Sequence, residues 1–92
     1  MQIVRSKEYI NTLKNIISYI SKDSKKRALV FKKELDKNID NLVYMPYKCR
    51  QSIYFDDENI RDLVFKGYVI PYFIDKNRIL ILGIIKYKQY LS

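Results

Sequence analysis

The sequence predicts an α+β domain in which a short N-terminal strand and an αα-hairpin pack on a twisted antiparallel sheet. In the first half, apolar residues recur at three- and four-residue spacing, which indicates two amphipathic helices. In the second half, short runs rich in β-branched and aromatic residues alternate with turn residues, which indicates strands. The 92 residues suffice for one hydrophobic core and not for two, so we expect a single domain over residues 1–92.

Residues 2–5 form the first expected strand, and the first helix follows directly. Ser6 carries a hydroxyl that accepts from a free backbone N–H of a first helical turn, so we expect it to be the N-cap. The apolar stripe of this helix is Tyr9, Ile10, Leu13, Ile16, Ile17 and Ile20. Residues 21–24, Ser-Lys-Asp-Ser, are expected to break the helix and to cap the next one.

The second helix has an apolar stripe of nearly heptad spacing. This stripe is Ala28, Phe31, Leu35, Ile39 and Leu42. Its opposite face interleaves lysines with acids, as in Lys32 and Asp36, which favours a solvated face over one that binds phosphates. Pro46 ends the helical region because it has no N–H for the hydrogen-bond ladder, so the two helices form an αα-hairpin.

Three further strands are expected at residues 60–65, 68–74 and 79–85. A short extended segment at 52–55 and a polar turn at 56–59 precede them. Because short turns connect consecutive strands, we expect an antiparallel meander of neighbours. Pro71 lacks a ladder donor, so a bulge or a missing hydrogen bond is expected beside it.

Both faces of the last expected strand are apolar. One face carries Ile79, Ile81 and Ile85, and the other carries Leu80, Leu82 and Ile84. The helices can cover only one of these faces. We therefore expect the other to be covered by loop 45–55, by the C-terminal tail or by a partner.

The composition restricts the chemistry. The net charge of +8 indicates a negatively charged partner, which is either nucleic acid or an acidic protein segment. The chain has no histidine, and Cys49 is its one cysteine, so a buried thiol is expected and a Cys–His pair, a zinc site and an internal disulfide are excluded. Gly67 and Gly83 are isolated and form no phosphate-binding loop. The acids at 56–58 are expected to form an exposed turn, so we expect neither cofactor nor metal.

Three features of the sequence predict a cytoplasmic protein. A lone cysteine fits a reducing compartment. The N-terminal residues lack the apolar region of a secretory signal. The longest apolar run, residues 79–85, is far shorter than a membrane span, so no membrane contact is expected.

The C-terminal segment alternates cations with aromatic rings in the order Lys86, Tyr87, Lys88, Gln89, Tyr90. No acid follows Asp75. Such a segment suits backbone phosphates with stacked bases, or an acidic stretch of a protein. An ordinary tail whose tyrosines fold onto the core is an equally good interpretation of the same residues.

The sequence resembles the RelE/ParE superfamily of bacterial toxins. The resemblance is carried by Arg61 in "IRDLVF" (60–65), by "KGYVIPY" (66–72) and by "ILILGIIK" (79–86). It implies the toxin of a type II toxin–antitoxin pair of the plasmid-stabilisation type, with a cognate and usually acidic antitoxin as partner in a hetero-oligomer. Members of the RelE kind cleave messenger RNA on the ribosome, whereas members of the ParE kind bind and inhibit DNA gyrase.

The residues favour the ParE side. Many ribonuclease members carry an arginine after the Gly-Tyr pair, where this chain has Val69, and lysines on the preceding strand, where it has Ile60 and Asp62. The basic and phenolic groups left for RNA cleavage are Arg61, Lys86, Lys88 and Tyr90. An ordinary lysine is a poor general base at neutral pH.

We therefore expect a binding toxin that arrests growth through gyrase, with Lys86, Lys88 and Tyr90 as target contacts. Two alternatives remain: a ribosome-dependent mRNA endoribonuclease using those residues with Arg61, and a member that binds its antitoxin but is no longer toxic. Arg61 matches an arginine common in ParE-like proteins. We expect it on the face of Leu63 and Phe65, with its guanidinium on a carboxylate or on the chain terminus.

Overall fold

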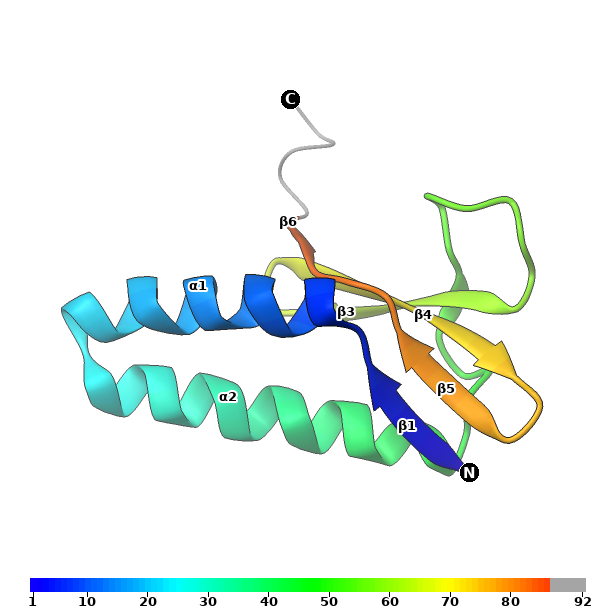
Figure 1. The fold of residues 1–92 in the computed structure, drawn as a ribbon, viewed down its shortest axis with the longest axis horizontal. Coiled ribbons are helices and arrows are strands. Elements are labelled where there is room, and N and C mark those ends of the chain that lie inside the picture. The colour runs from blue at the N-terminus through cyan, green and yellow to red at the C-terminus, as the bar shows by residue number, and fades with distance from the viewer. Residues whose placement is uncertain (87–92) are drawn as a thin grey trace.

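A computed structural model describes residues 1–86, and within them two helices pack on a mixed, mostly antiparallel six-stranded sheet (Figure 1). The helices are α1 (Lys7–Asp23) and α2 (Lys25–Asp40), and α2 runs into the 3₁₀ turn η1 (Asn41–Val43). The strands are β1 (Gln2–Arg5), β2 (Arg50–Gln51), β3 (Ile60–Phe65), β4 (Tyr68–Asp75), β5 (Arg78–Ile81) and β6 (Ile85–Lys86). The predicted α+β class, with an αα-hairpin on a sheet, is confirmed.

The order of the sheet is β1-β5-β4-β3-β2, and β6 pairs with β4. β3, β4 and β5 form the expected antiparallel meander. β1 pairs with β5 in parallel, with Ile3 opposite Ile79, so the first strand lies beside a late one. Parallel neighbours need a long connection, and the chain between β1 and β5 contains the αα-hairpin together with β2, β3 and β4.

Serine hydroxyls cap both helices as expected. Ser6 Oγ accepts from the N–H of Tyr9 at 3.0 Å, and Ser24 Oγ accepts from the N–H of Arg27 at 3.1 Å. The break between the helices is narrower than residues 21–24, because only Ser24 leaves the helical conformation. Its own N–H still bonds to the carbonyl of Ile20 at 2.9 Å, so one residue both ends α1 and begins α2.

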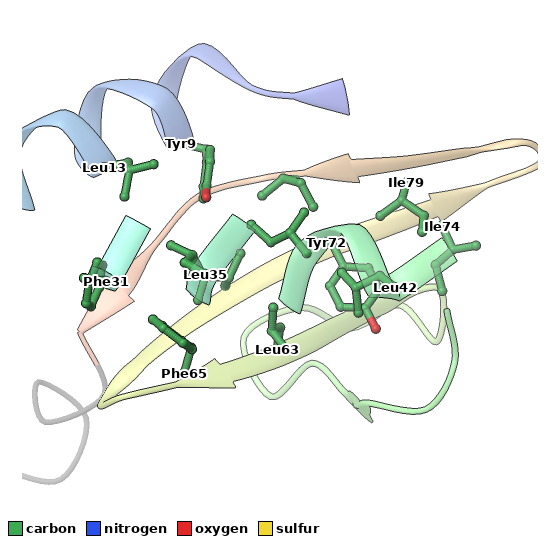
Figure 2. Packing of buried hydrophobic residues seen from close by; sticks show 13 residues of the cluster. Tyr9, Leu13, Phe31, Leu35, Leu42, Leu63, Phe65, Tyr72, Ile74 and Ile79 are labelled. Atoms are coloured by element: carbon green, nitrogen blue, oxygen red, sulfur yellow. The ribbon is translucent and has the colours of Figure 1, made fainter. Parts of the chain in front are cut away.

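The core lies between the αα-hairpin and one face of the sheet (Figure 2). Its buried members are Tyr9, Leu13, Phe31, Leu35, Ile39, Leu42, Leu63, Phe65, Ile70, Tyr72, Ile74, Ile79 and Ile81. Alternate residues of β3, β4 and β5 share this face, as the two-residue period of a strand requires. Ile10, which we expected in the stripe of α1, is 39% exposed.

The last expected strand is interrupted opposite Pro71. β5 ends opposite residue 72 and β6 begins opposite residue 69, so residues 82–84 face only residues 70–71. The Pro71 carbonyl accepts from the N–H of Leu82 at 2.9 Å. Because the N and O of one strand residue lie on the same edge, the missing donor of Pro71 faces this interruption. The predicted bulge is confirmed.

After the bulge, each residue lies on the face of the sheet opposite to the one that an uninterrupted strand would give it. Lys86 lies opposite Tyr68, whose ring packs on Phe31 in the core, so Lys86 and Ile84 lie on the helix side. Ile85 therefore lies on the other face. Our assignment of Ile85 to the face of Ile79 and Ile81 was wrong, because one extra residue reverses the alternation of a strand.

The expected extended segment at 52–55 was also wrong. The strand in this region is β2, where Gln51 lies opposite Arg61, and the chain bends after it. Ser52 Oγ accepts from the N–H of Tyr54 at 3.2 Å, so a side chain takes the donor that a strand ladder would use. Neither helix within residues 1–86 has the length and apolar composition of a membrane-spanning segment.

Candidate protein-binding surfaces

Lys86 is exposed at the end of β6, beside a groove between α1 and β6 of about 710 Å³. The lining of this α1–β6 groove is Thr12, Asn15, Ile16, Tyr19, Tyr68, Ile84, Ile85 and Lys86. Tyr19 is 75% exposed at its rim. A cation and an aromatic ring around an apolar floor suit side chains of a protein partner. Lys88 and Tyr90, the other expected target contacts, lie outside the described residues.

Arg61 lies on the helix-side face of β3 with Leu63 and Phe65, as expected. Its guanidinium donates from Nε to the Glu58 carbonyl at 3.0 Å and from Nη1 to the Cys49 carbonyl at 3.2 Å. These backbone oxygens replace the carboxylate that we expected, and the chain terminus lies outside the described residues. Its Cζ also lies 4.9 Å from the centre of the Tyr47 ring. Arg61 thus holds a loop.

Arg61 and Lys86 do not converge on one point. Arg61 lies opposite Tyr72 and Lys86 lies opposite Tyr68, on the two different edges of β4. Four residues along a strand separate them by about 13 Å, before the width of β4 is added. A ribonuclease needs its base, acid and phosphate-stabilising groups around one phosphodiester. The described members of the expected ribonuclease set therefore form no such cluster.

The loop that Arg61 holds spans residues 44–59, and we call it the anchored loop. From the other face of β3, Asp62 Oδ2 accepts from the N–H of Ile53 at 3.2 Å and from Arg50 Nε at 3.4 Å. Asp62 is only 2% exposed. Its buried carboxylate therefore fixes the loop from the side opposite to Arg61.

Tyr72 makes a third contact with the anchored loop. Its hydroxyl donates to the carbonyl of Pro46 at 2.6 Å. Burial raises the pKa of the Tyr72 phenol far above its ordinary value, and the nearby Cys49 thiol adds to this rise. The phenol thus stays protonated and keeps donating. Cys49 itself is a free thiol that is half-buried, whereas we expected a buried one.

The anchored loop exposes large apolar side chains, although its backbone is held firmly. These side chains are Tyr44, Met45, Tyr47, Ile53 and Phe55. The sequence carries a signal for them, since residues 44–47 and 53–55 are apolar runs beside proline and acidic turn residues where a loop is usually polar. We missed this surface because we read those runs as helix end and strand.

The acidic residues 56–58 lie in the same loop and shape a turn. Asp57 Oδ1 accepts from the N–H of Asn59 at 2.8 Å, while Asp56 and Glu58 are exposed. The Tyr47 hydroxyl also bonds to Asn59 Oδ1 at 2.8 Å. In residues 1–86, no three His, Cys, Asp or Glu residues are grouped so as to hold a metal ion.

A second groove, of about 310 Å³, lies where the β3–β4 turn meets the αα-hairpin. We call it the basic groove; its lining is Ile20, Lys26, Arg27, Val30, Phe31 and Lys66. Lys66 Nζ lies 2.6 Å from Glu34 Oε2, so this ion pair fixes the turn against α2. Arg27 Nη1 likewise lies 2.9 Å from Asp23 Oδ2. Three cations around an apolar floor, two of them paired with exposed acids, suit an acidic, partly apolar segment.

A third groove, of about 820 Å³, runs along the αα-hairpin near Arg5. There the guanidinium lies 3.4 Å from Asp40 Oδ1 and 3.8 Å from Asp36 Oδ1. Burial raises the pKa of Tyr9, which also lines this groove. Because the rim carries both basic and acidic side chains, this groove favours neither a positively nor a negatively charged partner.

Residues 3–89 match the family model described as ParE toxin of type II toxin–antitoxin system, parDE. Among solved structures, the fold is similar to a chain of "Chromosomal ParDE TA system from P. aeruginosa", with a TM-score of 0.76 and 19% sequence identity. That similarity covers 94% of this chain and 95% of the other. The curated proteins contain no match.

Proposed function

The chain belongs to the ParE toxin family of type II toxin–antitoxin systems, and from this premise we propose that it arrests growth by binding and inhibiting DNA gyrase in the cytoplasm. A cognate antitoxin neutralises it in a hetero-oligomer, as in a plasmid-stabilisation pair. The observation that carries inhibition by binding is the position of Arg61. Its Nε and Nη1 groups both donate to backbone carbonyls, and Arg61 lies about 13 Å along the sheet from Lys86. Its role in this proposal is therefore structural.

The target contacts that we propose are Lys86, Lys88 and Tyr90. Lys86 is exposed and adjoins the α1–β6 groove, where Tyr19 adds an exposed ring. Aromatic residues supply much of the binding energy of protein interfaces, and rim cations speed the encounter with a partner of opposite charge. This end of the sheet therefore places a cation, Lys86, and an aromatic ring, Tyr19, beside an apolar groove that a partner can contact.

The antitoxin contact that we propose is the basic groove. The chain carries a net charge of +8, and an acidic antitoxin segment is drawn to such a surface at low salt. Lys26, Arg27 and Lys66 surround the groove, and Val30 and Phe31 line its floor. The turn at Lys66 is two residues from Tyr68, so an antitoxin seated here lies close to the α1–β6 groove and blocks the target contact.

The first test is induced expression without antitoxin, comparing the onset of arrest in DNA and protein synthesis. Earlier arrest of DNA synthesis supports gyrase inhibition. Earlier arrest of protein synthesis with cleavage of translated mRNA supports the RelE-like alternative. Unimpaired growth supports a member that binds antitoxin but is not toxic.

A second test uses purified gyrase and plasmid supercoiling. Lys86→Glu should weaken inhibition, because it reverses the charge at the proposed contact. Lys33→Glu is the matched control, since Lys33 is exposed on α2 and lines neither of the two proposed contact grooves. Equal inhibition by both variants would remove Lys86 from the target contact.

A further inference from the structure

The anchored loop, residues 44–59, combines a fixed backbone with exposed apolar side chains. Arg61, Asp62 and Tyr72 of the sheet all bind its main chain. Residues in loops usually lose conformational freedom when a partner binds, and that ordering weakens affinity. Here three side chains of the sheet already restrain the backbone of the loop in the free protein, which lowers that entropic cost.

The exposed side chains of the anchored loop are of the kind that anchor interfaces. Tyr44 is 80% exposed, Ile53 is 62% exposed and Phe55 is 41% exposed. A fold that only needed to connect α2 to β3 gains nothing by presenting such groups to water. Buried aromatic and aliphatic anchors on a pre-organised backbone are typical of the centre of a protein interface.

The charge of the anchored loop differs from that of the rest of the chain. The loop contains two basic and three acidic residues, so it carries −1 while the whole chain carries +8. One of the two basic residues, Arg50, is paired with buried Asp62 at 3.4 Å. The exposed acids Asp56 and Glu58 adjoin Phe55. The local charge therefore favours a partner whose apolar site has basic residues around it over an acidic antitoxin segment.

Under the proposed function, gyrase meets that requirement at a surface other than the one that Lys86 contacts, because an enzyme that holds duplex DNA concentrates basic residues near the duplex. We propose that the anchored loop is a preformed docking surface for gyrase and lies apart from the antitoxin contact. This inference rests on the proposed function and adds a second target contact to it.

The position of the loop keeps the two partners apart. The Asn59 carbonyl accepts from the N–H of Ile74 at 2.8 Å, which places the loop at the C-terminal end of β4. Lys66 and the basic groove lie at the N-terminal end, about 20 Å along the strand. Figure 1 shows the loop on the side away from the tip of the αα-hairpin. An antitoxin in the basic groove thus leaves the loop free.

The test measures gyrase inhibition and antitoxin affinity on the full chain. Ile53→Gln with Phe55→Gln removes the apolar anchors, and Asp56→Lys with Glu58→Lys reverses the charge. Ile10→Gln with Leu29→Gln is the matched control, because these residues are 39% and 56% exposed on the helices. The probes are purified gyrase in a plasmid supercoiling assay and the cognate antitoxin that the proposed function requires.

Each loop variant should raise the toxin concentration for half-inhibition by about tenfold or more, as for the loss of interface anchors. The antitoxin Kd and the Tm should stay unchanged, and the control should behave as the original chain. Full inhibition by both loop variants would overturn the docking surface and leave the proposed function standing. Loss of antitoxin binding with unchanged Tm would assign the loop to the antitoxin and also overturn it. If the original chain fails to inhibit gyrase, the proposed function falls, and the inference with it.

If the Ile53→Gln, Phe55→Gln variant has a lowered Tm, the Asp56→Lys, Glu58→Lys variant alone tests the docking surface. Asp56 and Glu58 are exposed, so their replacement leaves the packing of the core unchanged.

Discussion

Arg61 and Asp62 are adjacent in β3, lie on opposite faces of the sheet, and bind the same loop. Arg61 reaches the Cys49 and Glu58 carbonyls on the helix side. Asp62, opposite Pro71, accepts from the Ile53 N–H on the other side. Two consecutive side chains of one strand thus clamp the anchored loop from both faces.

Arg61→Lys should loosen the anchored loop. A lysine ammonium cannot span the two carbonyls that the planar guanidinium binds, and it stacks less well on Tyr47. We expect a loss of about 1–2 kcal/mol in the free energy of unfolding, from two hydrogen bonds with a charged donor. Urea unfolding checks the loss, and hydrogen exchange should speed up in residues 45–59. Lost toxicity with unchanged stability and exchange would point instead to a direct role in chemistry.

Tyr72→Phe should lower the free energy of unfolding at pH 7 and should make that free energy decrease less steeply as the pH rises above 10. Burial raises the pKa of Tyr72 above its ordinary value of 10.0, so above pH 10 the unfolded chain releases a proton that the folded chain retains. Its contribution is therefore complete below pH 10 and is lost as pH rises further. Removing the hydroxyl also deletes the bond to Pro46, which costs about 1 kcal/mol at pH 7.

Urea titrations between pH 7 and pH 11 measure both effects of Tyr72→Phe. The control is Tyr44→Phe at an 80% exposed position, which should leave the free energy of unfolding unchanged at pH 7. An identical pH slope for the original chain and Tyr72→Phe would contradict the linkage.

Gly67→Ala should destabilise the folded protein, whereas Gly83→Ala should leave its stability unchanged. A Cβ added at either glycine meets no atom within 4 Å, so the two sites differ in backbone conformation and not in space. Gly67 has φ +83° in the turn after Lys66, where an alanine is strained by about 1 kcal/mol. Thermal unfolding of both variants checks this difference. Equal Tm values would mean that the turn relaxes without strain.

Ile84→Ala should lower stability more than Ile85→Ala. Ile84 packs against the core cluster after the bulge, whereas Ile85 lies on the other face of the sheet. We expect a loss of about 2 kcal/mol for Ile84→Ala and of less than about 1 kcal/mol for Ile85→Ala. Chemical denaturation distinguishes them, and the reverse order would restore an uninterrupted strand over residues 79–85.

Local features of the fold were predictable from the sequence. The caps at Ser6 and Ser24 bind N–H groups only three residues away, so their signal lies within one turn of chain. The bulge was predictable because Pro71 lacks a donor wherever its partner lies. The resulting exchange of faces at Ile84 was not, since it depends on where the extra residue inserts.

Features that depend on partners far away in the chain could not be predicted from the sequence. The bend after Gln51 relies on Asp62 accepting the Ile53 N–H, and nothing within 52–55 shows that acceptor. The face of Arg61 followed from alternation with Leu63, but its partners are carbonyls, which every residue has. Lys86 is exposed at the end of β6. Whether it contacts gyrase stays a prediction, as do the roles of Lys88 and Tyr90.

The parallel pairing of β1 with β5 ties the order of folding to the order of synthesis. Gln2 lies opposite Arg78, so β1 is translated long before β5, its neighbour in the described sheet, exists. The αα-hairpin has local contacts and forms fast, whereas closing a loop of this length is slow. On the ribosome, β1 therefore stays unpaired until β5 has been made, which follows the synthesis of both helices and of β2, β3 and β4.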